Sequence, residues 1–200
     1  YIISKSNEID NKDFILEGYK QMIFYNIQTN NSHDMNEYIE LALDLAVKCN
    51  YHKEIGIILR LKGLYNIMIG NYFLAEKLLK ESINIFNVTE EVANRYSINI
   101  AAAYNYIGEI RFASAQYTEA TKEFLKAIEL TKNKNALSSL SVFYINAGKS
   151  SYVQGNIKDA QEHFKNAYTL YGQFDSFWKR PVLDSYMTLT EIALKNYESS

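Results

Sequence analysis

The side chains best suited to metal binding or nucleophilic catalysis in this sequence are three histidines and one cysteine. They are His33, Cys49, His52 and His163. The histidines lie far apart, and none belongs to a His-Glu-x-x-His or similar zinc pattern. Cys49 and His52 could meet at a helix end, but a cysteine nucleophile also needs an orienting group and an oxyanion site. We therefore expect a structural cysteine, no metal site, no cofactor and no enzymatic activity.

The charged residues are better explained by helix stability than by chemistry. Thr89, followed by Glu90 and Glu91, indicates an N-cap with two carboxylates at the positive end of a helix dipole. Four lysines are interleaved with acids, as is typical of a solvated outer helix face; they are Lys122, Lys126, Lys132 and Lys134. The formal net charge of -2 supplies no positive field for a phosphate backbone. We expect no direct nucleic-acid binding by this segment.

Composition favours a helical protein of a reducing compartment. Eight glycines and a single proline in 200 residues leave few points at which a helix must break, which indicates an all-α chain. A single cysteine cannot form an internal disulfide, so a cytoplasmic location is expected. The apolar runs are too short and too often interrupted by charge to span a membrane. Because the chain begins at Tyr1 rather than at a methionine, we expect it to be a piece of a longer polypeptide.

Small and aromatic residues between positions 101 and 130 recur at the spacing of two packed helices. Tyr104, Ile107 and Gly108 share one helical face, and Ala120 and Phe124 belong to a second apolar stripe. The glycine and alanine of this pattern recur before and after it. The three pairs are Gly63 with Ala75, Gly108 with Ala120, and Gly148 with Ala160.

This unit resembles the tetratricopeptide repeat (TPR), a helix hairpin with glycine, alanine and aromatic residues at fixed offsets. The resemblance implies an all-α, right-handed superhelix (α-solenoid) of about nine helices in antiparallel pairs, in a single domain over residues 1–200. A degenerate repeat is predicted over 13–49, clear repeats over 52–87, 92–132 and 137–172, and a terminal helix over 176–198. In the first of these, Ser32 or Asp34 is predicted to cap the second helix.

The signature glycines are spaced more widely than in a standard TPR, which repeats at about 34 residues. Gly63, Gly108 and Gly148 are separated by 45 and then by 40 residues. Because no helix breaker occurs between Val92 and Phe112, we expect the helix capped by Thr89 to run to about Ala113. We expect the additional residues to lie between the repeats and to lengthen the helices. Stretched repeats of this kind resemble those of bacterial cytoplasmic regulators and sensor proteins.

In the TPR family the first helix of each repeat lines a concave groove. The resemblance assigns to this groove Arg60 and Leu64 from the first clear repeat, Asn105, Glu109 and Phe112 from the second, and Asn146, Lys149 and Tyr152 from the third. Amides such as Asn105 and Asn146 could bond a peptide backbone, and Arg60, Glu109 and Lys149 could select charge.

An alternative explanation stays open for these side chains, since several could instead contact neighbouring repeats. For Phe112 and Tyr152, packing between helices is favoured because large rings are usually buried. One known TPR ligand, the C-terminal carboxylate of a chaperone tail, is not expected. Of the residues that hold it, only the first charge is matched here, by Arg60.

Two functions follow from the resemblance. The first is a non-catalytic scaffold that binds a protein or peptide, as the interaction or sensory input module of a larger bacterial signalling or regulatory protein. The second is the ligand-binding half of a cytoplasmic peptide-pheromone receptor that controls transcription. A homodimer is compatible with both, and neither involves a membrane.

Overall fold

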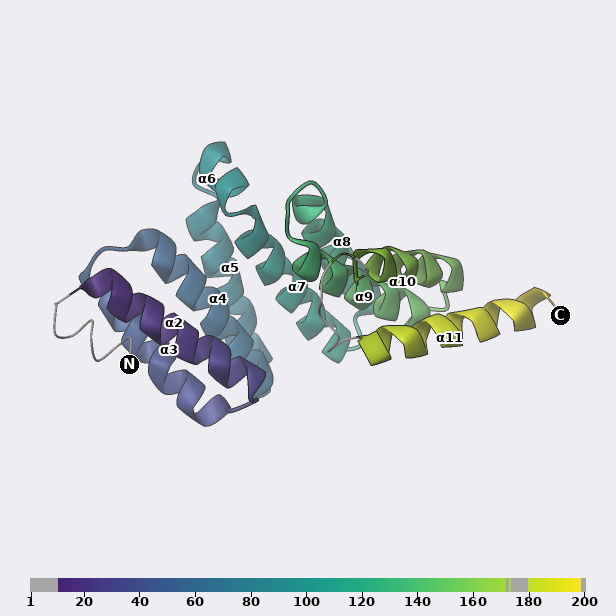
Figure 1. Cartoon of the computed structure of the whole chain (residues 1–200), viewed down its shortest axis with the longest axis horizontal. Coiled ribbons are helices and arrows are strands. Elements are labelled where there is room, and N and C mark those ends of the chain that lie inside the picture. Colours follow the sequence, from purple (N-terminus) through teal and green to yellow (C-terminus); the bar gives the residue numbers. More distant parts are fainter. Residues whose placement is uncertain (1–10, 172, 174–179, 199–200) are drawn as a thin grey trace. The chain divides into compact units, whose positions relative to one another are not determined.

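A computed structural model describes residues 11–171, 173 and 180–198 (Figure 1). All regular elements in these residues are α-helices, which confirms the all-α class. They are α2 (Lys12–Gln28), α3 (Ser32–Lys48), α4 (His52–Met68), α5 (Tyr72–Phe86), α6 (Glu90–Arg95), α7 (Ser97–Ala113), α8 (Tyr117–Thr131), α9 (Leu137–Val153), α10 (Ile157–Tyr171) and α11 (Arg180–Glu198).

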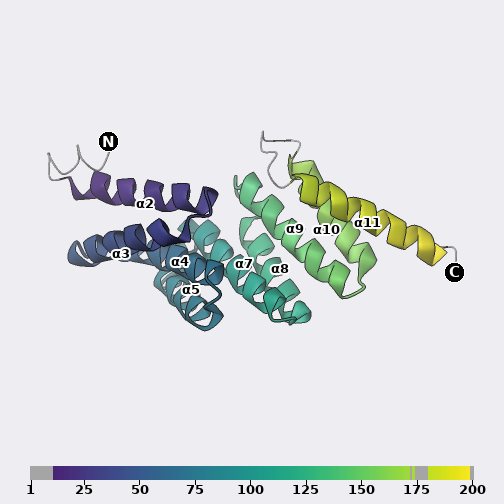
Figure 2. The same ribbon diagram turned by 90° about the horizontal axis from the view of Figure 1, so that it is seen from below.

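The chain divides into two compact units, residues 1–99 and residues 100–200, and each is described by itself. The expectation of a single domain over residues 1–200 stays a prediction. In the first unit α2 packs on α3, α3 on α4, and α4 on α5. In the second unit α8 packs on α9, α9 on α10, and α10 on α11 (Figure 2). The predicted terminal helix is α11; positions 176–179 of that prediction, and position 172 of the third clear repeat, lie outside the described residues.

Asparagine and threonine side chains start several of these helices. Asn11, Asn31 and Asn71 accept a hydrogen bond from the backbone N–H three residues on, and so does Thr89, as predicted. The prediction that Ser32 or Asp34 caps α3 is wrong. The cap is Asn31, whose Oδ1 accepts from the N–H of Asp34 and whose Nδ2 donates to the Asp34 carboxylate at 2.8 Å.

The two helices of each pair are joined by turns of one geometry. Asn30, Gly70, Ala115 and Gly155 have positive φ angles of 53°, 78°, 58° and 79°. In each turn the N–H of the next residue donates to a carbonyl five positions before it, at 2.8–3.0 Å. This is the hydrogen bond of a Schellman motif, which ends one helix and directs the chain into the next.

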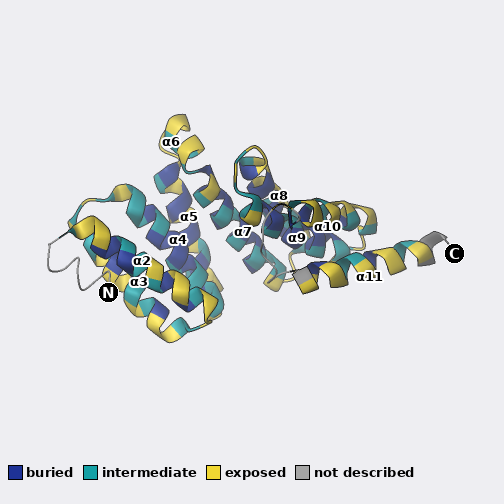
Figure 3. Ribbon diagram, in the orientation of Figure 1, coloured by how far each residue is buried: buried dark blue, intermediate teal, exposed yellow. Residues whose placement is uncertain are grey.

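The core of each unit lies between its helices, and the hairpin ends are exposed (Figure 3). In the first unit it includes Ile23, Met35 and Leu61, all with no exposed surface. In the second unit Phe124 of α8 and Phe164 of α10 are 1% and 0% exposed. Burying a side chain of this size stabilises the fold by about 1.5–3 kcal/mol.

The signature glycines lie where the two helices of a pair approach each other. A Cβ atom on Gly108 or Gly148 would lie 2.5 Å from the ring of Phe124 or Phe164. A Cβ atom on Gly63 would lie 2.8 Å from Leu79. The predicted reason for these glycines, close approach of the two helices, is therefore confirmed.

The prediction of one helix from the Thr89 cap to about Ala113 is wrong. The helix ends at Arg95, and α7 begins at Ser97. At the break the ring of Tyr96 stacks on Phe86 of α5, with centroids 4.8 Å apart and planes 16° apart. Tyr96 itself, with φ -101° and ψ 18°, is the C-cap of α6.

The additional residues lie between the helix pairs, as expected, but the expectation that they lengthen the helices is wrong. The first helix of each pair has 17 residues, and the second has 15 in all pairs except α2 and α3. The wider spacing comes from the segments between pairs, which are residues 87–96 with α6, and residues 132–136. The short helix α6 also raises the number of described helices to ten, against the nine expected.

Candidate functional site

A small hollow lies among α7, α8 and α9 of the second unit. Its volume is about 60 Å³, and its walls are Glu109, Phe112, Phe124, Asn146 and Lys149. Four of these residues were assigned to the groove from the sequence. The fifth, Phe124, comes from the second helix of the hairpin and was expected only in the core. The Phe124 ring reaches the hollow because it packs against Gly108 of the first helix. The sequence signal for this position was the spacing between Gly108 and Phe124.

Hydrogen bonds fix the polar wall of this hollow. Asn146 Nδ2 donates to Asn105 Oδ1 at 2.9 Å and to Glu109 Oε1 at 3.1 Å. Asn105 Nδ2 donates to the same Glu109 oxygen at 2.8 Å. Asn105 is 2% exposed and Asn146 is 7% exposed. We call these three residues the amide-carboxylate cluster.

The cluster changes the predicted role of Asn105. Its amide donates to Glu109 and its carbonyl oxygen accepts from Asn146, so it holds the other two residues in position, and it is not one of the walls of the hollow. Asn146 differs, because its carbonyl oxygen accepts no hydrogen bond from any described residue. A buried amide held by two bonds presents that acceptor in a fixed orientation.

The cationic wall of the hollow is Lys149 on α9. Its ammonium group lies 5.7 Å from the centre of the Phe112 ring on α7, a cation–π contact. Among the residues that the structure describes, no carboxylate lies within ion-pair distance of Lys149. The hollow therefore combines a carboxylate held by amides, a free acceptor and an ammonium group without an ionic partner.

The two aromatic groove residues pack as predicted. Phe112 meets Tyr117 edge-on at 5.2 Å, and Tyr152 meets Tyr186 of α11 edge-on at 5.9 Å. Both are half-buried. Phe112 still lines the hollow, whereas Tyr152 lies outside its walls.

The remaining two predicted groove residues belong to the first unit, which is described by itself, and their place in a groove stays a prediction. Leu64 on α4 is half-buried. Arg60, one turn before it, is 9% exposed, and its buried Nε has no hydrogen-bond partner.

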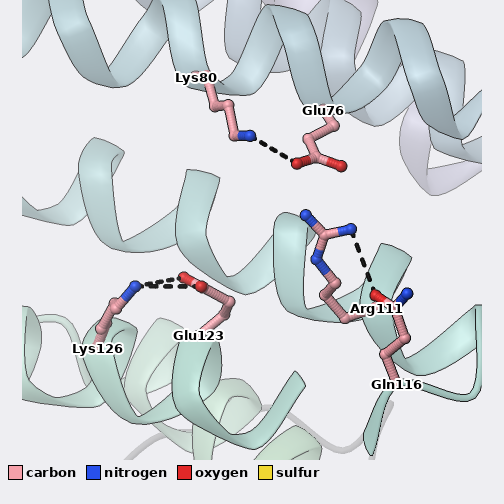
Figure 4. Close-up of polar contacts among 6 residues, drawn as sticks. All are labelled: Glu76, Lys80, Arg111, Gln116, Glu123 and Lys126. Carbon is pink, nitrogen blue, oxygen red and sulfur yellow. Dashed lines mark hydrogen bonds and ion pairs between the residues drawn. The ribbon is translucent and has the colours of Figure 1, made fainter. Parts of the chain in front are cut away.

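The lysines predicted on an outer face lie on or beside α8. Lys126 pairs with Glu123 at 3.1 Å (Figure 4), and Lys132 pairs with Glu129 at 2.7 Å. These pairs lie three residues apart on exposed helix surface, where each contributes a few tenths of a kcal/mol. Lys122 is exposed as well.

The histidines and the cysteine are not brought together. His33 and His52 are exposed, and Cys49 is a free, half-buried thiol. His163 lies beside Tyr144, with ring centres 6.1 Å apart, and its Nδ1 has no hydrogen-bond partner. Burial, partly offset by the charges of Glu162 and Asp159, lowers the pKa of this imidazole. No group of three potential metal ligands occurs in the part of the chain that the structure describes.

Comparison with known proteins gives no match by sequence, either to a protein-family model or to a curated protein. Solved structures do match. BtubC from P. vanneervenii superimposes with a TM-score of 0.65 over 82% of this chain, at 16% identity. The apo form of RapI superimposes with a TM-score of 0.72 over 92% of this chain, at 15% identity. A signal-transduction ATPase (STAND) protein with a tetratricopeptide repeat sensor, from Pyrococcus horikoshii, superimposes with a TM-score of 0.69 over 92%, at 15% identity.

The chain has a tetratricopeptide-repeat fold. The fold rests on helix pairs closed over a signature glycine, and on superposition with proteins of the same helical architecture. The chain spans 65% of the length of BtubC and of RapI, and 28% of the length of the STAND protein. None of its described helices is long and apolar enough to cross a membrane.

Proposed function

We propose that this TPR-fold chain is a non-catalytic scaffold that binds a peptide segment of a partner, as the input module of a larger signalling protein. The observation that carries the proposal is the hollow beside the amide-carboxylate cluster. Similarity to a STAND protein whose TPR part is a sensor supports the signalling context.

The chemistry of the hollow suits one peptide group. Asn146 Oδ1 is an acceptor for a main-chain N–H, and the Lys149 ammonium is a donor for a main-chain carbonyl. Asn105 and Glu109 hold Asn146 in place before a ligand arrives, which lowers the entropy cost of binding. The ring of Phe112 supplies apolar contact area for a neighbouring side chain.

The test is capture of peptides from a library of random octapeptides by the purified chain. The double variant Glu109→Gln with Lys149→Met keeps a hydrogen-bond acceptor for both amides and removes the two charges. We expect it to bind the captured peptides about tenfold more weakly or worse, because hydrogen bonds to charged groups are lost.

The matched control is Glu119→Gln with Lys122→Met, the same changes at exposed positions of α8. It should bind the peptides as the parent chain does. If both double variants bind equally well, the hollow is not the binding site.

The same amides also suit the ligand-binding half of a peptide-pheromone receptor. The two functions differ in the domain attached to this chain. A DNA-binding helix-turn-helix domain before Tyr1 would favour the receptor, and a catalytic output domain after Ser200 would favour the signalling module. The full gene sequence distinguishes them.

A further inference from the structure

Arg60 is a cation of the first unit with which no described residue forms a hydrogen bond or an ion pair. It lies on α4 and is 9% exposed. Its Nε–H is buried without an acceptor among the described residues, whereas its two terminal nitrogens are not buried and can meet a ligand from solvent. Buried charges in proteins are ordinarily paired and hydrogen-bonded, because removal from water is costly.

The other charged side chains of α4 are already engaged. Glu54 pairs with Lys20 of α2 at 2.9 Å, and Lys62 pairs with Glu40 of α3 at 2.6 Å. Lys53 donates to the carbonyl of Ile85. Each of these three groups therefore has a polar partner within the first unit, whereas Arg60 has none among the described residues, and the partner that suits a guanidinium group is an anion.

We infer that Arg60 binds the carboxylate side chain of an Asp or Glu residue in the partner peptide. A guanidinium group presents paired N–H donors that match the two oxygens of a carboxylate. Ile57 and Leu64 lie three residues before and four residues after Arg60, on the same helix face, and both are half-buried. They offer apolar contact to the methylene groups of an acidic side chain.

The same face disfavours a chain-terminal carboxylate. One turn after Arg60 the helix carries Leu64 rather than a second donor, and a terminal carboxylate is generally held by several donors. The inference rests on the proposed function in one respect, which is that a bound peptide supplies the carboxylate. The binding of a carboxylate by Arg60 can be tested without any peptide.

The first experiment follows the Nε–H signal of Arg60 by NMR during titration with sodium acetate, with sodium chloride adjusted to keep the ionic strength constant. The signal is assigned by its loss in Arg60→Lys. We expect a saturable shift, whereas the exposed Arg95, which pairs with Glu91, should show none. An Arg60 signal that does not move, or moves only as Arg95 does, would overturn the inference.

The second experiment offers random octapeptides to the parent chain and to Arg60→Met, each library with free and with amidated C termini. Peptides captured by the parent chain should be enriched in Asp and Glu in both libraries. Their affinity for Arg60→Met should fall about 10- to 100-fold, the loss expected for a charged hydrogen bond. Circular dichroism checks that Arg60→Met is folded, and Arg60→Lys, which keeps the charge, should retain part of the affinity.

The outcomes separate this inference from the proposed function. Capture of peptides without enrichment in acids, or with equal affinity for Arg60→Met, would overturn the Arg60 site and leave peptide binding standing. Capture only of peptides with a free C terminus would overturn the side-chain assignment. A saturable acetate shift without capture of any peptide would support the anion site and overturn the proposed function.

Discussion

Helix α4 of the first unit and helices α7 and α9 of the second unit differ in whether their buried polar side chains are hydrogen-bonded. In the second unit Asn105, Glu109 and Asn146 satisfy one another across α7 and α9. In the first unit the Nε–H of Arg60 is buried, and no described residue accepts a hydrogen bond from it. A hydrogen-bonded cluster stabilises the folded chain and orients a binding wall, whereas a buried N–H without an acceptor costs stability until a ligand or a rearrangement satisfies it. The comparison therefore predicts mutational effects of opposite sign in the two units.

The largest loss of stability is expected at the signature glycines, which contact a phenylalanine ring in the second unit and a leucine side chain in the first. Gly108→Leu in the second unit would drive a side chain into the rigid ring of Phe124. We expect a loss of about 3 kcal/mol, typical of an overpacked core. Gly63→Leu in the first unit meets the end of the more flexible Leu79 and should cost less. Thermal unfolding of both variants measures the difference, and an unchanged melting temperature for Gly108→Leu would refute the hairpin contact.

The next largest loss of stability is expected from a mutation that breaks the hydrogen bonds of the amide-carboxylate cluster. Asn146→Ala would remove one donor from the half-buried Glu109 and would leave the buried Oδ1 of Asn105 without the hydrogen bond that it accepts. We expect the free energy of unfolding to fall by about 2 kcal/mol. Urea denaturation gives this value. Asn135→Ala at an exposed position is the control, and a similar small effect for both would mean that the cluster contributes nothing to stability.

Arg60→Met should act in the other direction. Removing a buried N–H that has no acceptor while keeping apolar volume relieves a desolvation cost, so we expect the free energy of unfolding to rise by about 1 kcal/mol. The same denaturation experiment measures it. A clear loss of stability would show that the guanidinium group already has a favourable partner and that the two units do not differ as described.

The smallest effect concerns pH. The pKa of His163 is lowered in the folded chain because its imidazole is buried. The folded state thus binds fewer protons than the unfolded state, and stability should fall as pH drops below about 6.5, the ordinary pKa of histidine. Melting temperatures between pH 7.5 and pH 5.5 should show this fall for the parent chain. His163→Phe, which keeps a ring beside Tyr144, should lose most of it.

Periodicity made most of the fold predictable, and long-range packing made the rest unpredictable. The positions of Gly108 and Gly148 indicate close helix approach because each is followed, 16 residues later, by the aromatic residue that it contacts. The break at Tyr96 leaves no such local signal, since it depends on stacking with Phe86 of an earlier helix. The cap of α3 was missed because three neighbouring polar residues, Asn31, Ser32 and Asp34, could each have provided it.

The candidate site shows the same division. The resemblance to the TPR family assigned Glu109, Asn146 and Lys149 to one groove, and all three line one hollow. The hydrogen bond from Asn146 to Asn105 was not predictable. These residues are 41 positions apart, and their contact depends on the register between α7 and α9.

The turns inside the helix pairs explain how a shared fold can escape detection by sequence. The residue with positive φ is Asn30, Gly70, Ala115 or Gly155, so side-chain identity at this position has diverged. What all four turns keep is a main-chain hydrogen bond across six residues, which any amino acid except proline can donate. Selection on such a turn acts on backbone geometry and leaves little trace in residue type. The structure therefore remains similar to TPR-fold proteins at 15–16% identity, although no family model matches the sequence.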